Sequence, residues 1–204
     1  MTETSIGDYA FISDCQSAAL VKRDGTVEWY CPERFDSPSV FARLLDEDGG
    51  HWSIRPTGEF EVERAYLDDT MVLRTVFRTP QGRIALTDAL ALESGARGHD
   101  IGVRVPHVLL RRAEGVEGEV ELEVEFSPPP RVRSHHSTRV TDGYWSRGTR
   151  RSRRASLGYR LSIRNRWIQG YCAAYVASRR GVGLRTGLPA GIQGRERHHI
   201  RLGG

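Results

Sequence analysis

The strictest pattern in the sequence is an unbroken alternation of acidic and apolar side chains near position 120. The alternating residues are Glu119, Val120, Glu121, Leu122, Glu123, Val124, Glu125 and Phe126. Successive side chains of a β-strand point to opposite faces, so the segment predicts a strand with one face in a core and the other in water. The glutamates belong to the ordinary solvated face of that strand, and we do not assign them a catalytic role.

A second strand is expected just before this one, over residues 108–112. Between the two strands lies the segment Glu114-Gly115-Val116-Glu117-Gly118, whose glycines favour a turn. The sequence therefore predicts a hairpin made of residues 108–112 and 119–126.

Short segments with a period of two occupy much of the chain before position 108. The sequence predicts strands over residues 8–13, 18–21, 27–30, 51–55, 60–66, 71–78 and 83–92. Asp24-Gly25 supplies the positive φ that a tight hairpin turn requires. Short strands with turn signals about every ten residues are typical of an all-β fold, and we expect an antiparallel β-sandwich.

One segment has the pattern of a helix. Ser37 is a suitable N-cap and Pro38 a suitable first helical residue, and they precede Val40, Phe41 and Leu44–Leu45 at helical spacing. We expect a helix of two or three turns here.

Charge divides the chain after Pro130. Residues 1–130 carry 13 basic and 24 acidic side chains, whereas residues 131–204 carry 17 arginines and only Asp142 and Glu196 as acids. The second segment lacks a regular apolar period, and its like charges oppose the burial that would offset ordering entropy. We therefore expect a β-sandwich domain over 1–130 that is incomplete, and an irregular, poorly folded basic tail over 131–204.

Several classes of protein are excluded or disfavoured. No apolar run approaches the roughly 20 residues that cross a bilayer, and the acidic start lacks the pattern of a signal peptide, so we expect a cytoplasmic protein with no membrane partner. Cys15, Cys31 and Cys172 form neither an even framework nor a CxxC pair. No phosphate-binding, dinucleotide-binding or nucleophile-elbow motif occurs, and we expect no cofactor.

Four motifs in a fixed order link the first 50 residues to a known family. They are Ile6–Ala10 (IGDYA), Ser17–Val21 (SAALV), Arg23–Trp29 (RDGTVEW) and Arg34–Phe41 (RFDSPSVF), and Gly50–Ile54 (GHWSI) follows them. In this order they resemble the N-terminal domain of bacterial glycoside hydrolase family 15, the glucoamylase and trehalase group. The Arg34–Phe41 run is the most specific of them, and the likeness continues more loosely to about Pro128.

The resemblance implies a β-sandwich domain that precedes an (α/α)6-barrel catalytic domain. In the family the barrel hydrolyses α-glucosides such as trehalose or maltooligosaccharides with inversion, by means of one carboxylic acid and one carboxylate. Both groups lie downstream of the N-terminal domain, so we expect a truncated, non-catalytic domain that is inactive alone. Its partner would be the missing barrel, in cis or in trans, and α-glucosides would be bound only through that barrel.

The same resemblance makes the loop of Arg34, Phe35, Asp36 and Ser37 a candidate for the domain interface or the pocket rim. The alternative is a turn and capping segment, in which Asp36 and Ser37 satisfy amides at a helix start while Phe35 packs. Trp29 and Trp52 are candidates for sugar stacking, but their alternating strand positions favour packing in or beside the core.

The tail departs from the family pattern at Pro130. Pro130 to His136 can be encoded as CCC CGA GTA CGG TCT CAT CAC, and skipping one C gives Pro-Glu-Tyr-Gly-Leu-Ile, which resembles the family continuation. With a choice among synonymous codons, the same displacement gives Gly-Pro-Asp-Val-Val-Val-Ala for residues 148–155, and an alternating strand, a turn and another strand for residues 169–189. We interpret residues 131–204 as the product of a frameshift.

Two other interpretations concern the tail. An acidic β-domain with an arginine-rich tail, such as residues 150–154, would bind nucleic acid or another polyanion, but no known RNA- or DNA-binding motif supports a biological role. The pairs His135-His136 and His198-His199 lack a cysteine or carboxylate at ligand spacing, so we expect no metal site.

Overall fold

The structure is a computed structural model that describes residues 5–127, 157–164, 171–178 and 181–187, the last three segments at the level of the backbone. Apart from two single-turn 3-10 helices, η1 (Ile6–Asp8) and η2 (Gly98–Asp100), its regular elements are strands. They are β1 (Tyr9–Ser13), β2 (Ala18–Lys22), β3 (Thr26–Cys31), β4 (Phe41–Ala42), β5 (His51–Pro56), β6 (Glu61–Tyr66), β7 (Leu73–Thr79), β8 (Gly82–Leu90), β9 (Val108–Ser127), β10 (Leu157–Arg164), β11 (Tyr171–Ser178) and β12 (Gly181–Gly187). The predicted all-β class is confirmed, and so are the seven strands expected before position 108, within two residues at each end. No described helix is long and apolar enough to cross a bilayer.

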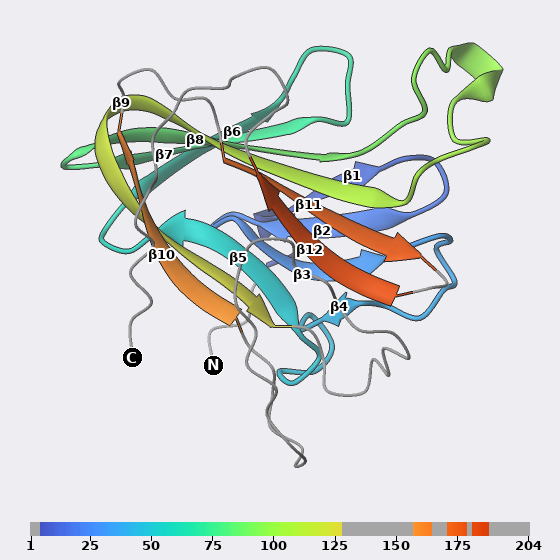
Figure 1. Cartoon of the computed structure of the whole chain (residues 1–204), viewed down its shortest axis with the longest axis horizontal. Helices are drawn as coiled ribbons and strands as arrows, with labels where there is room; N and C mark the ends of the chain where they lie inside the picture. Colours follow the sequence, from blue (N-terminus) through green and yellow to red (C-terminus); the bar gives the residue numbers. More distant parts are fainter. Residues whose placement is uncertain (1–4, 128–156, 165–170, 179–180, 188–204) are drawn as a thin grey trace.

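All strand pairs are antiparallel, and the strands form one curled sheet in the order β1-β2-β3-β5-β9-β8-β7-β6 (Figure 1). The long strand β9 belongs to both halves of this sheet. Its first part pairs with β8 and its last part, from Leu122 to Ser127, pairs with β5. The two layers of the predicted sandwich are therefore the two halves of a sheet that bends along β9.

The hairpin predicted around residues 114–118 is wrong, because β9 runs through this segment without reversing. The glycine-rich segment contains a β-bulge instead: Arg83 lies opposite Glu117, and Ile84 opposite Gly115, so that Val116 is the extra residue. A bulge bends a strand and increases its twist. Gly118 adopts a positive φ of 66° close to the 81–82 turn. Glycines that suggested a turn therefore provide the bend between the two halves.

The predicted turn at Asp24-Gly25 is present. Gly25 has a φ of 83°, its N–H donates to the Lys22 carbonyl at 3.0 Å, and the Asp24 carboxylate accepts from the Thr26 N–H at 3.0 Å. A side chain at position 25 would also meet the Ile54 carbonyl at 2.5 Å. Only glycine fits this turn, which connects β2 to β3.

The helix predicted after Ser37 is wrong. The chain forms turns there, and Phe41–Ala42 pair as β4 with Trp29 and Tyr30 of β3. Phe41 is fully buried and packs edge-on against Phe126 at 5.6 Å between ring centroids. The local capping signal is overridden because this strand pairing buries Phe41 in the core.

One core fills the space between the two halves of the sheet, and it contains a buried ion pair. Arg111 of β9 and Asp88 of β8 are both fully buried, with Nε–Oδ1 at 2.8 Å and Nη2–Oδ2 at 3.2 Å. The guanidinium also donates to the carbonyls of Trp52 and Gly25 in the opposite half, and it lies 5.1 Å from the Trp52 ring centroid. Arg111 thus connects both halves of the sheet through hydrogen bonds.

The two terminal strands of the sheet, β1 and β6, are linked by side chains. The Tyr66 hydroxyl accepts from the Phe11 N–H at 3.0 Å and donates to the Phe11 carbonyl at 2.7 Å. Arg64 donates to the carbonyls of Gly7 and Asp8 at 3.1 and 2.8 Å. The Tyr66 bonds occupy backbone groups of β1 that would otherwise be an unpaired sheet edge, and the Arg64 bonds hold η1 just before it.

Strands β10, β11 and β12 lie in the range predicted to be an irregular tail. β10 pairs with residues 119–126 of β9, and β11 pairs with residues 108–113 and with β12. Residues 128–156, 165–170, 179–180 and 188–204 lie outside the described residues, and with them the arginine run 150–154 and both histidine pairs. The division at Pro130 remains a prediction.

Candidate functional site

The Arg34–Ser37 loop connects β3 to β4 and is exposed to solvent. Arg34 forms a bidentate ion pair with Asp36, Nε–Oδ1 at 2.8 Å and Nη2–Oδ2 at 3.2 Å, and a backbone bond from the Ser37 N–H to the Arg34 carbonyl at 3.1 Å closes a turn. The Phe35 side chain is 57% exposed. The turn of the alternative interpretation is therefore present, but its helix capping and the packing of Phe35 are wrong, since no helix follows the loop and Phe35 is exposed.

Two further connections lie at the same end of the sandwich as this loop. They are the turn of residues 14–17 between β1 and β2, and the long β8–β9 connection of residues 91–107, which extends beyond the strands in Figure 1. The Gln16 side chain donates to the Gly102 carbonyl, and the Tyr30 hydroxyl donates to the His107 carbonyl at 3.4 Å. Exposed apolar side chains at this end are Phe35, Leu92, Ile101 and Val103.

Buried polar groups fix the 14–17 turn and the 91–107 connection through hydrogen bonds. Asp14 and Ser17 are fully buried, and the Asp14 carboxylate accepts from the Ser17 N–H at 2.6 Å and from the Gln16 N–H at 3.0 Å. Burial, and then the nearby charge of Asp14, raises the pKa of Tyr30 well above its ordinary value. Tyr30 is consequently a neutral hydrogen-bond donor to the 91–107 connection at any ordinary pH.

A second polar cluster surrounds Glu28, which sequence reasoning did not single out. Glu28 is the extra residue of a bulge in β3, because Leu20 pairs with Trp29 and Val21 with Val27. Although nearly buried, its carboxylate accepts from the Tyr9 hydroxyl at 2.6 Å and from Arg43 Nη2 at 2.9 Å. The cluster connects β1, β3 and the β4–β5 loop. Its only sequence signal is one acid inside an otherwise apolar strand.

The two tryptophans and the glutamate row lie where the alternation places them. Trp52 is fully buried in the core, and Trp29 is half-buried. Glutamates 119, 121, 123 and 125 are exposed or half-buried, and three of them have polar neighbours on β5 or just after it: Glu121 with Thr57, Glu123 with Arg55 and Glu125 with His51. Packing therefore accounts for the positions of the two tryptophans, and the solvent-exposed face of β9 accounts for the glutamates.

Within the described part of the chain, no group of three or more His, Cys, Asp or Glu side chains is arranged to hold a metal ion. Cys15 is exposed and Cys31 is buried, and both are free thiols. Burial raises the pKa of the Cys31 thiol, which disfavours the reactive thiolate.

The strands β1 to β9 lie within a match to a protein family. The family model described as trehalase-like, N-terminal matches residues 2–153, which is most of the chain. The chain belongs to this family. The resemblance recognised in the four N-terminal motifs is thereby confirmed, and every strand from β1 to β9 of this trehalase-like N-terminal domain lies inside the matched range.

Several curated trehalases are similar to this trehalase-like N-terminal domain. The trehalase of Mycolicibacterium smegmatis is 37% identical over 136 residues, which cover 60% of this chain and 20% of the relative. The trehalase of Mycobacterium tuberculosis is 36% identical with the same coverage, and Trehalase 2 of Sulfolobus acidocaldarius is 41% identical over 86 residues, 42% of this chain and 14% of the relative. The chain thus spans about a fifth or less of these relatives. No solved structure gave a significant match.

Proposed function

We propose that this chain is the non-catalytic N-terminal domain of a trehalase-type glycoside hydrolase and that its catalytic part is a separate domain. The observation that carries the proposal is the family match over residues 2–153, combined with relatives whose other four fifths have no counterpart here. The described domain has a curled sheet around one core, with exposed loops at one end of the sandwich. This arrangement suits a role in positioning the catalytic domain.

The reaction of the whole enzyme follows from the resemblance. In the parent enzyme, a carboxylic acid of the (α/α)6 barrel protonates the leaving oxygen of an α-glucoside such as trehalose or a maltooligosaccharide, and a carboxylate activates water for inversion. The glutamates of β9 do not take these roles in our proposal, because their alternate placement and partners on β5 account for them. The location of the enzyme is proposed to be the cytoplasm.

We assign contact with the catalytic domain to the Arg34–Ser37 loop. Phe35 is a large apolar side chain, 57% exposed on a turn that the Arg34–Asp36 pair holds in shape. Leu92, Ile101 and Val103 add exposed apolar surface to the same end of the sandwich. Apolar side chains gathered on exposed loops are typical of surfaces that another domain covers.

A binding experiment tests this assignment. The part of the M. smegmatis trehalase outside the matched region would be immobilised, and binding of this chain measured by biolayer interferometry. Phe35→Ser should weaken binding about tenfold, because an aromatic side chain in an interface core commonly contributes this much. Leu45→Ser is the matched control, since Leu45 is 74% exposed on the β4–β5 loop. Equal binding of both variants would contradict the role of the loop.

The frameshift origin of residues 131–204 stays a separate proposal. The curated mycobacterial relatives match 60% of the chain, which is close to the share that residues 1–130 represent. Resequencing of the locus tests the idea. Barrel-coding sequence in a displaced frame downstream of codon 130 is expected, and one continuous frame without it would overturn the proposal.

A further inference from the structure

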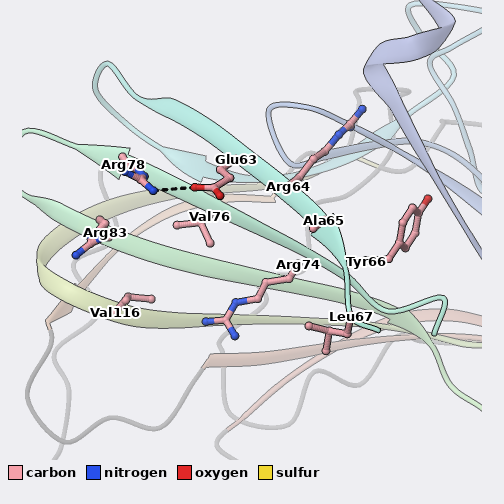
Figure 2. Close-up of a pocket in the computed structure, with 10 residues that line it drawn as sticks. All are labelled: Glu63, Arg64, Ala65, Tyr66, Leu67, Arg74, Val76, Arg78, Arg83 and Val116. Atoms are coloured by element: carbon pink, nitrogen blue, oxygen red, sulfur yellow. Dashed lines mark hydrogen bonds and ion pairs between the residues drawn. The ribbon is translucent and has the colours of Figure 1, made fainter. Parts of the chain in front are cut away.

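A shallow hollow lies on the outer face of the β6–β7–β8 half of the sheet (Figure 2). Its volume is about 320 Å³, at the lower end of the range for small-molecule sites. Val76 and Val116 provide an apolar floor, and Arg74, Arg78 and Arg83 surround it.

Strand register places these arginines on one face. Arg74, Val76 and Arg78 are alternate residues of β7, so their side chains point to the same side of the sheet. Arg78 lies directly opposite Arg83 of β8, and Val76 lies opposite Glu63 of β6. Like charges directly opposite each other are unfavourable unless other charges compensate them.

Glutamates neutralise the charge of two of these three arginines. Arg78 Nη2 lies 2.7 Å from the Glu63 carboxylate, and Arg83 pairs with Glu117. Among the described residues, neither a hydrogen bond nor an ion pair involves Arg74, although its side chain is exposed at the hollow. Arg64 contributes only part of the rim, because its guanidinium turns away to the carbonyls of Gly7 and Asp8.

The positive hollow contrasts with the surface around it. Residues 1–130 carry 24 acidic and 13 basic side chains, yet the charged residues that line the hollow are four arginines and one glutamate. Glu63 and Glu117 offset the charges of Arg78 and Arg83, so the net positive charge of the hollow comes from Arg64 and Arg74. Because the domain around it is acidic, this is the place where an anion is favoured.

We propose that this hollow binds a small organic anion through a carboxylate or phosphate group. Arg74 is the principal contact, because its planar guanidinium has no partner among the described residues and can donate two parallel hydrogen bonds to such an oxyanion. Arg78 and Arg83, each paired with a glutamate, border the other side, and the apolar body of the ligand lies over Val76 and Val116.

Solution NMR of the full chain tests the proposal with citrate and inorganic phosphate as probes. Both are titrated against a sodium chloride series of equal ionic strength, and the backbone amides of Val76 and Val116 are followed. Saturable shifts at these amides are expected with at least one probe. A tighter fit to citrate assigns the site to carboxylates, and a tighter fit to phosphate assigns it to phosphate groups.

Variants distinguish anion binding at the hollow from anion binding by the basic tail, because every variant keeps the same tail. Arg74→Ala should weaken binding at Val76 and Val116 about tenfold. Arg104→Ala is the matched control and should change it less than twofold, because Arg104 is an exposed arginine paired with Glu93 at 3.1 Å on the 91–107 connection. Unchanged melting temperatures would show that both variants fold.

Two results would overturn the proposal. One is the absence of saturable shifts with both probes beyond those that chloride causes. The other is equal binding by Arg74→Ala and Arg104→Ala. Arg74→Lys, which keeps the charge but loses the planar fork, should give an intermediate affinity.

Discussion

At the scale of single residues, Arg111 is the side chain on which the fold depends most. Its position between Leu109 and Ala113 places it on the core face of β9, where a charge is expensive unless it is fully paired. Asp88, Trp52 and Gly25 supply that pairing from three separate segments. Alternation alone could have revealed an arginine on an apolar face, but its partners depend on contacts distant in sequence.

Replacing Arg111 by methionine should lower the free energy of unfolding by about 3–5 kcal/mol, because Asp88 would remain buried without a counter-charge. Urea unfolding measures the change. The matched control is Arg112→Met on the exposed face, where a loose 3.5 Å contact to Glu114 predicts an effect within about 0.5 kcal/mol.

The double variant Arg111→Met with Asp88→Leu should recover part of the loss, since both buried charges are then gone. Equal stability of Arg111→Met and Arg112→Met would contradict the role given to the buried pair.

Tyr30 predicts how stability responds to alkaline pH. Its pKa is raised in the folded state, first by burial and then by Asp14, so the folded protein keeps a proton that the unfolded chain releases near pH 10. The corresponding stability is complete below about pH 10 and is lost as the pH rises further. Thermal melts between pH 8 and 11 should show this loss.

In Tyr30→Phe the alkaline loss should be smaller, because phenylalanine does not titrate. The variant also loses the bond to the His107 carbonyl, so the comparison concerns the slope with pH and not the absolute melting temperature. Identical slopes for the two proteins would count against a neutral, buried Tyr30.

At the scale of elements, strands were predictable where one face is core and the other is water. Residues 119–126 alternate completely, and the structure places their apolar members in the core. The failures have physical causes. The glycines at 115 and 118 predict a turn, but in the structure they allow β9 to bend. The Ser37–Pro38 signal predicts a helix, but the chain buries Phe41 in a strand pairing instead. Neither the bend of β9 nor the strand at Phe41 can be predicted from the local sequence, because both depend on pairing with distant strands.

The exposed loop that is the candidate site could be predicted only in part. Family motifs singled out Arg34 to Ser37, and the structure places them on one exposed turn. The neighbouring Ile101 and Val103 were missed because they belong to a connection whose sequence has no regular period and whose position depends on contacts to Gln16 and Tyr30.

Gly118→Ala tests the bend in β9. A Cβ at this position would clash with the Gln81 carbonyl oxygen, in backbone with a φ of 66°. We expect a loss of about 2 kcal/mol or more in the free energy of unfolding, measured by urea titration. Gly58→Ala is the control, since nothing lies within 4 Å of the added carbon. A small and equal effect of both changes would show that the bend does not require glycine.

At the scale of the whole molecule, the chain combines an acidic β-rich part with an arginine-rich one. The net charge of +4 is the sum of these opposite parts and describes neither. The described strands β1 to β9 lie in the range that matches the trehalase-like N-terminal family. The similar mycobacterial trehalases are about five times longer than the region that matches them. In our account, the described sheet supports and positions a catalytic domain and performs no hydrolysis itself.

Glucose release by the purified chain tests this account most directly. The chain would be incubated with trehalose and with maltose, and glucose measured by a coupled enzymatic assay, with a complete trehalase as positive control. We predict no release above the buffer blank for either sugar. Release that increases in proportion to the amount of purified chain, and that disappears when the chain is denatured, would contradict the account.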